Sequence, residues 1–136
     1  MDIAALIFWV LTALGGFLML GIWVSRGGAR GGESRLPVPV IFGHFGLAAI
    51  GLVVWIVYVF AGGATTAWIA FALLVPVAVL GFVMLLRWLP VRRAQGETGS
   101  ATPAEAHFPL PVVAGHGLFA VVTVVLVLLG AIGAGA

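Results

Sequence analysis

Apolar side chains fill four long stretches of the chain, and polar residues gather in the segments between them. The apolar runs cover about residues 3–24, 38–61, 67–89 and 110–134. A helix needs about 20 apolar residues to cross the hydrocarbon core of a bilayer, and each run reaches or passes that length. The runs lack the alternation of a membrane β-barrel, so helices must satisfy their backbone. The pattern predicts an all-α, polytopic membrane protein, a four-transmembrane-helix bundle.

Two blocks of the first half of the chain recur in the second half. The segment PVPVIFGHFG, which contains His44, matches PLPVVAGHGL, in which His116 follows 72 positions later. The segment GFLMLGIW, which begins at Gly16, matches GFVMLLRW, which begins at Gly81, 65 positions later. Such internal similarity indicates a tandem duplication of one helical hairpin.

The duplication predicts how the chain is organised. We expect a single membrane domain, residues 1–136, with one repeat at 3–61, a second at 66–134, and loops at 25–37 and 90–109. Each repeat would cross the membrane twice, so the two would be parallel. Parallel repeats are related by a pseudo-twofold axis along the membrane normal, which places matching residues at the same depth.

The basic residues indicate the orientation in the membrane. All six are arginines in or beside the two longer connections, whereas the middle connection, AGGATTA, carries no charge. The positive-inside rule places both arginine-bearing loops in the cytoplasm and both termini outside, and we expect a bacterial plasma membrane. No basic segment precedes the first run, so we expect a retained helix rather than a cleaved signal peptide. The arginines thus mark topology, and we expect no nucleic-acid partner.

The two histidines of the matching segments are the main candidates for chemistry. His44 and His116 each follow the first proline of their segment by seven residues, which is about 10 Å along a helix. The helix faces that carry them continue through small residues, Ala48 and Ala120, which favour close helix packing. We therefore expect both imidazoles inside the bundle, toward its cytoplasmic side, and on opposite sides of the axis.

Two imidazoles from facing helices are a suitable ligand set for one b-type haem iron. The second and fourth helices would supply His44 and His116, and glycines beside them, Gly43 and Gly115, would let a porphyrin lie close to the backbone. The arginines expected to pair with haem propionates are Arg35, Arg87, Arg92 and Arg93. For Arg87, whose counterpart in the first repeat is Ile22, a lipid phosphate is the alternative partner. The plan resembles that of four-helix membrane b-type cytochromes, and it implies electron transfer with quinone or a redox partner subunit.

Two other interpretations of the same layer stay open. With Met19 and Met84, expected at about the depth of the histidines, the site would suit copper, Cu(I) in particular. Alternatively the histidines form hydrogen bonds between helices, in a cofactor-free accessory subunit of a larger homo- or hetero-oligomeric complex. The apolar runs contain no paired carboxylates and no nucleophile–base set. An electron carrier or subunit is therefore favoured over a stand-alone enzyme.

Overall fold

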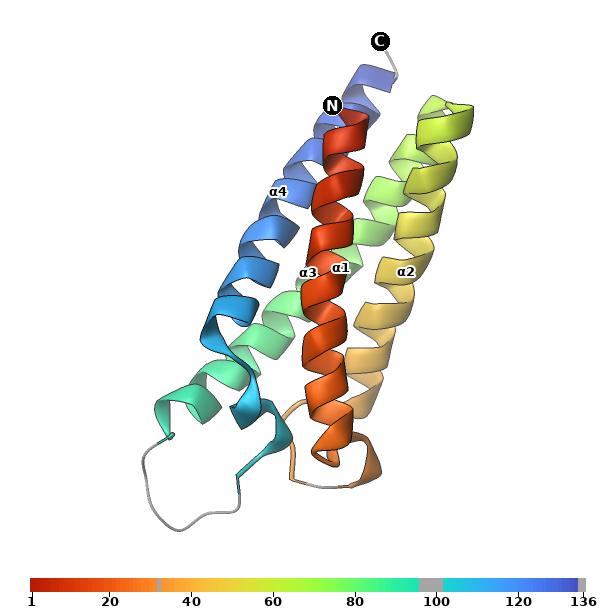
Figure 1. The fold of residues 1–136 in the computed structure, drawn as a ribbon. Helices are drawn as coiled ribbons and strands as arrows, with labels where there is room; N and C mark the ends of the chain where they lie inside the picture. The colour runs from red at the N-terminus through yellow and green to blue at the C-terminus, as the bar shows by residue number, and fades with distance from the viewer. Residues whose placement is uncertain (32, 96–101, 135–136) are drawn as a thin grey trace.

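The computed structural model describes residues 1–31, 33–95 and 102–134, and these fold into four long helices. The helices are α1 (Asp2–Ser25), α2 (Val38–Ala61), α3 (Ala64–Arg93) and α4 (Leu110–Ala134), with short 3-10 helices η1 (Gly28–Arg30) and η2 (Ala104–His107) in the connections. The prediction of four long apolar helices is confirmed: each is long and apolar enough to cross a membrane. The fold is compatible with an integral multi-pass membrane protein. Both connections that contain arginines lie at the same end of the bundle (Figure 1).

The third helix is longer than the apolar run that predicts it. It begins at Ala64 and continues through Pro90 to Arg93, whereas the run spans about 67–89. A proline removes one intrahelical hydrogen bond, but the last turns bury Trp88 and Val91, and this burial offsets the loss. The loop expected from residue 90 therefore begins later, and its middle, 96–101, lies outside the described residues.

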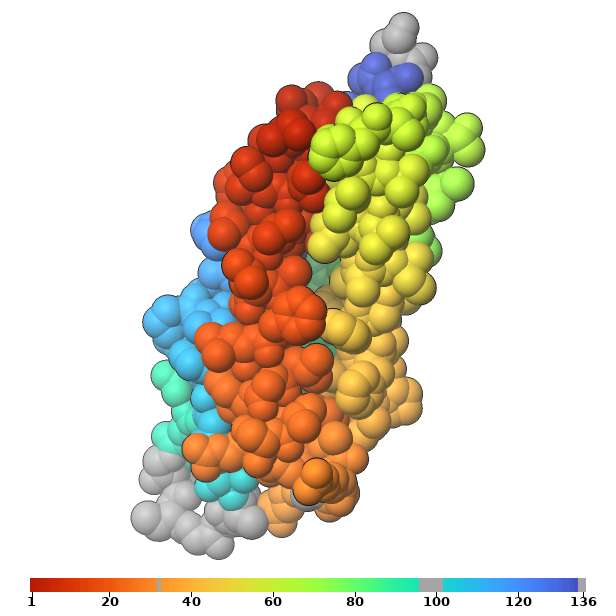
Figure 2. Space-filling model, turned by 45° about the vertical axis from the view of Figure 1, so that its right-hand side comes forward, coloured from red at the N-terminus to blue at the C-terminus, as the bar shows by residue number. Residues whose placement is uncertain are grey.

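The four helices are arranged as two pairs. The most extensive contacts join α1 to α4 and α2 to α3, whereas α1 and α2 contact each other only slightly. Helices that follow one another across the first loop therefore belong to different pairs. A space-filling view shows a furrow between the loop-side halves of α1 and α2, in which atoms of a helix behind them are visible (Figure 2).

The buried apolar residues form two separate clusters at the two ends of the bundle. Near the termini, a terminal cluster is centred on Trp9, Trp55 and Tyr58, together with alanines where the helices approach closely. Near the loops, a loop cluster is centred on Trp23 and Trp88. The middle layer between the two clusters is where the histidines lie.

The two connections at the arginine-bearing end are joined by a buried carboxylate. Glu105 of η2 is 0% exposed, and it accepts hydrogen bonds from the Ser34 hydroxyl at 2.8 Å and from the Arg35 backbone N–H. The Ser34 hydroxyl in turn accepts a bond from Trp23 Nε1 at 2.9 Å, and Trp88 Nε1 donates to the Glu105 carbonyl. The network ties both loops to the ends of α1 and α3.

Gly130 allows α4 to pack tightly at the terminal end. A Cβ at this position would lie 2.7 Å from Trp55 Cη2 and 2.9 Å from Asp2 Oδ1. We expect Gly130→Ala to lower the free energy of unfolding by about 1–3 kcal/mol, because the added methyl group overpacks this site. Gly133→Ala is the matched control, since a Cβ there meets nothing within 4 Å. Thermal unfolding in detergent measures both, and equal stability of the two variants would contradict the prediction.

Candidate functional site

His44 and His116 lie side by side inside the bundle. Their ring centroids are 6.3 Å apart, and the ring planes are tilted by 53°. His44 belongs to α2 and His116 to α4, so each helix pair contributes one imidazole. Both side chains are partly buried. The two imidazoles therefore approach each other across the interface between the pairs.

Each imidazole is held by a backbone carbonyl of its own helix pair. His44 Nδ1 is 2.9 Å from the Val77 carbonyl oxygen on α3, and His116 Nδ1 is 2.8 Å from the Thr12 carbonyl oxygen on α1. A carbonyl only accepts, so Nδ1 carries the proton and donates in both rings. In a neutral imidazole this leaves Nε2 unprotonated, with a lone pair free to bind a metal. The contacts thus fix the tautomer that a ligand histidine needs.

A glycine lies against each ring. An added Cβ at Gly16 would be 3.2 Å from His116 Cε1, and one at Gly81 would be 3.3 Å from His44 Cε1. These distances are shorter than ordinary van der Waals contact, so a larger residue would push the imidazole away from its carbonyl. The two glycines therefore determine where the rings lie.

Four residues that shape the site were not among the sequence candidates. Gly16 and Gly81 begin the second matching block, so the repeat itself contained a signal for them. Thr12 and Val77 contribute through their backbone carbonyls, which carry no side-chain signature. The positions of these two carbonyls could not be predicted from the sequence, because every residue has a backbone carbonyl.

The glycines next to the histidines in the chain border open space. A Cβ at Gly115 would meet nothing within 4 Å, and one at Gly43 would meet only Leu80 Cδ1 at 3.8 Å. Beside His116, an apolar groove of about 310 Å³ lies between α1 and α4, with Gly115 and Phe119 in its lining. There is thus unfilled space around the histidine layer.

The methionines lie on the loop side of the histidine layer. Met19 and Met84 are partly buried and pack against the loop cluster. Each follows its ring-contacting glycine by three residues, which is about 4.5 Å along the helix. Within the described part of the chain, no group of three or more His, Cys, Asp or Glu side chains could hold a metal ion.

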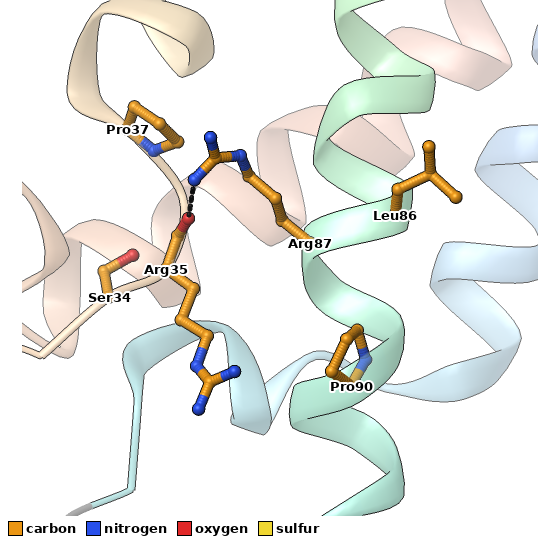
Figure 3. A pocket seen from close by; sticks show the side chains of 6 residues that line it. All are labelled: Ser34, Arg35, Pro37, Leu86, Arg87 and Pro90. Atoms are coloured by element: carbon orange, nitrogen blue, oxygen red, sulfur yellow. Dashed lines mark hydrogen bonds between the residues drawn. The ribbon is translucent and has the colours of Figure 1, made fainter.

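The four candidate arginines lie at the loop end of the bundle. Arg35 and Arg87 line one cavity, and Arg87 Nη1 donates to the Arg35 carbonyl at 3.3 Å (Figure 3). Arg92 donates to the Gln95 side chain, and Arg93 is exposed in the last turn of α3. The structure therefore brings Arg35 and Arg87 together and places the other two apart from that cavity's lining.

Comparisons with known proteins identify no relative. No family model matches the chain, and no curated protein or solved structure is significantly similar to it. Function must therefore be argued from the site.

Proposed function

We propose that the protein binds one b-type haem between the two helix pairs, with His44 and His116 as axial ligands, and that it transfers electrons in a membrane. The observation that carries this proposal is the spacing of the two rings. Two imidazoles that bind one metal through Nε2, at about 2.0–2.1 Å, have centroids roughly 6 Å apart. The measured 6.3 Å fits such a pair.

The arrangement of the helices also supports a flat cofactor. Each imidazole is anchored within its own pair, so a group between the rings would lie in the interface between the pairs. That interface is loosely packed where α1 meets α2, and the apolar clusters lie above and below it.

The positions of the contacts support two parallel repeats related by a pseudo-twofold axis. The anchoring carbonyls of Thr12 and Val77 are 65 positions apart. The same spacing separates the ring-contacting glycines, Gly16 and Gly81. With the arginine-bearing loops in the cytoplasm, as we propose, both histidines would lie in the cytoplasmic half of a bacterial plasma membrane.

A haem with two imidazole ligands supplies one-electron chemistry, since both axial positions of its iron are filled. The residues of the chain itself would orient the two imidazoles and keep water away from the site. The Thr12 and Val77 carbonyls orient the rings and increase the basicity of Nε2. The apolar clusters on either side exclude water. We propose quinone or a redox partner subunit as the source and destination of electrons. The proposal rests on the histidines and does not use the arginines.

A cofactor-free accessory subunit is the second candidate, and one observation favours it. Both histidines already make hydrogen bonds between helices, to Val77 and Thr12, and so have a structural use without any ligand. The copper hypothesis gains no comparable support, because the methionines pack against the loop cluster.

An absorption spectrum separates these candidates. The protein is expressed with haem supplied, solubilised in detergent, purified, and measured in its oxidised and reduced forms. We expect a Soret band and the sharp reduced bands of low-spin, six-coordinate haem b. Absence of a Soret band under these conditions would refute the haem proposal, and metal analysis of the same sample tests for copper.

Gly81→Val is expected to weaken haem binding by about tenfold, because the added side chain displaces the ring of His44 from the Val77 carbonyl. Gly21→Val is the matched control: it places the same residue in a long helix, α1, at an exposed position where a Cβ meets nothing within 4 Å and which does not flank a histidine. Haem titration of both purified variants measures the effect. Equal affinity for the two variants would show that Gly81 does not position His44.

A further inference from the structure

A cavity at the loop end of the bundle lies apart from the histidine layer. It measures about 480 Å³ and opens to the surface between the start of α2 and the last turns of α3 (Figure 3). Its lining consists of Ser34, Arg35, Pro37, Leu86, Arg87 and Pro90. Two of these side chains carry a guanidinium, and none of the six lining residues is acidic.

The Arg87 guanidinium is held in place while most of its hydrogen-bonding capacity remains free. One Nη1 hydrogen is donated to the Arg35 carbonyl at 3.3 Å. A guanidinium has five N–H donors, so the others remain available for a ligand. Figure 3 shows the Arg87 side chain extending from α3 toward the first loop, with the Arg35 side chain extending from that loop on the other side of the bonded carbonyl.

The Glu105 carboxylate, close to two of the lining residues, makes hydrogen bonds to groups other than the guanidiniums. The Glu105 carboxylate is fully buried behind Ser34, and its recorded partners are the Ser34 hydroxyl and the Arg35 backbone N–H. The Ser34 hydroxyl is occupied by this bond, so recognition of a ligand falls to the two arginines. The lining of the cavity therefore carries positive charge, as a site for an anion would.

The surroundings of the arginines indicate what kind of anion fits. Leu86 and Pro90 add apolar surface to the lining, and Leu86 is 67% exposed. All six arginines lie at this end of the fold, where the apolar helices meet the polar loops. Arginine forks bind phosphate oxygens with two parallel hydrogen bonds, and basic pockets at this depth bind lipid headgroups.

We propose that the cavity formed by Arg35 and Arg87 binds a phosphate group, as carried by the headgroup of an anionic phospholipid or by a soluble phosphate. This site is independent of haem binding. For Arg87 the sequence left two partners open, a haem propionate and a lipid phosphate, and the proposal assigns this residue to the phosphate.

Native mass spectrometry of the detergent-solubilised protein tests the proposal. Phosphatidylglycerol, phosphatidylcholine and inorganic phosphate are added in separate titrations to the unsubstituted protein and to Arg35→Gln, Arg87→Gln and Arg26→Gln. Arg26→Gln is the charge-matched control, because Arg26 is exposed at the same end and is not among the cavity residues. We expect about tenfold weaker phosphatidylglycerol binding in each cavity variant, and unchanged binding in the control.

Each outcome decides the proposal. Binding of phosphatidylglycerol alone, lost in both cavity variants, supports a lipid source, and equal dependence of inorganic phosphate binding on both arginines supports a soluble one. Equal loss in Arg26→Gln, or no binding of either probe, overturns the proposal. The visible spectrum of Arg87→Gln separates this site from the haem proposal. Loss of haem with unchanged lipid binding would show that Arg87 pairs with a haem propionate, and it would also overturn the phosphate proposal.

Discussion

Replacing His44 or His116 with alanine is expected to abolish the low-spin spectrum of bound haem. If the two imidazoles bind haem as proposed, each substitution would remove one of the two ligands, so that the iron would become five-coordinate and high-spin or the haem would be lost. Loss of a residue that only supports a ligand lowers metal affinity by about 10–100-fold, and loss of a ligand itself should exceed the lower end of that range. Absorption spectra and the haem-to-protein ratio of the purified variants measure the effect.

The fold should survive these substitutions. Each variant loses one hydrogen bond to a backbone carbonyl, which contributes about 0.6 kcal/mol on average in membrane proteins. Circular dichroism should therefore show unchanged helix content. His107→Ala is the control, because His107 is exposed on η2 and should leave the spectrum unaltered. Low-spin haem retained in both His44→Ala and His116→Ala would show that the ligands are misassigned.

Replacing Glu105 with alanine is expected to be the most destabilising single change at the loop end. The Ser34 hydroxyl and the Arg35 N–H would each lose a charged acceptor inside a buried site. Hydrogen bonds to charged groups contribute about 1.5–3 kcal/mol each, so we expect the free energy of unfolding to fall by about 3–6 kcal/mol. Thermal unfolding in detergent, followed by circular dichroism, measures this change.

Glu105→Gln makes the test sharper. The Ser34 oxygen already accepts from Trp23 Nε1 and from the Leu36 N–H, so it has no lone pair left for an amide donor. The glutamine variant keeps the shape of the side chain but mismatches this bond, and it should lose about half as much stability as Glu105→Ala. Glu33→Gln, at an exposed position of the first loop, should change stability by less than about 0.5 kcal/mol. Similar stability of all three variants would contradict the role of Glu105.

Much of the architecture could be predicted because a bilayer imposes a simple rule on composition. Long apolar runs must become helices, and α2 (Val38–Ala61) and α4 (Leu110–Ala134) have the bounds of their runs. The end of α3 was harder to predict, because Pro90 is a local signal to stop and the burial of Val91 is a tertiary effect. The burial of Val91 outweighs the stop signal of Pro90, so the helix continues to Arg93.

The candidate site likewise contains residues with a signal in the sequence and residues placed only by tertiary contacts. His44 and His116 could be singled out because ionisable residues are rare inside apolar runs and these two recur in matching segments. Their carbonyl partners could not, since any residue has a carbonyl. The burial of Glu105 was also hidden, because its partners come from the other loop, about 70 positions earlier in the chain.

The pairing of the helices has a consequence for the order of assembly during synthesis. α2 and α3 are joined by a tight turn at Gly62 and Gly63, so this pair can form as soon as both helices have left the ribosome. α1 precedes these two helices in the chain, whereas its main partner, α4, follows them. The contacts that hold His116 can therefore form only after α4 has been made. We expect a chain stalled before α4 to contain His44 of α2 without its partner imidazole.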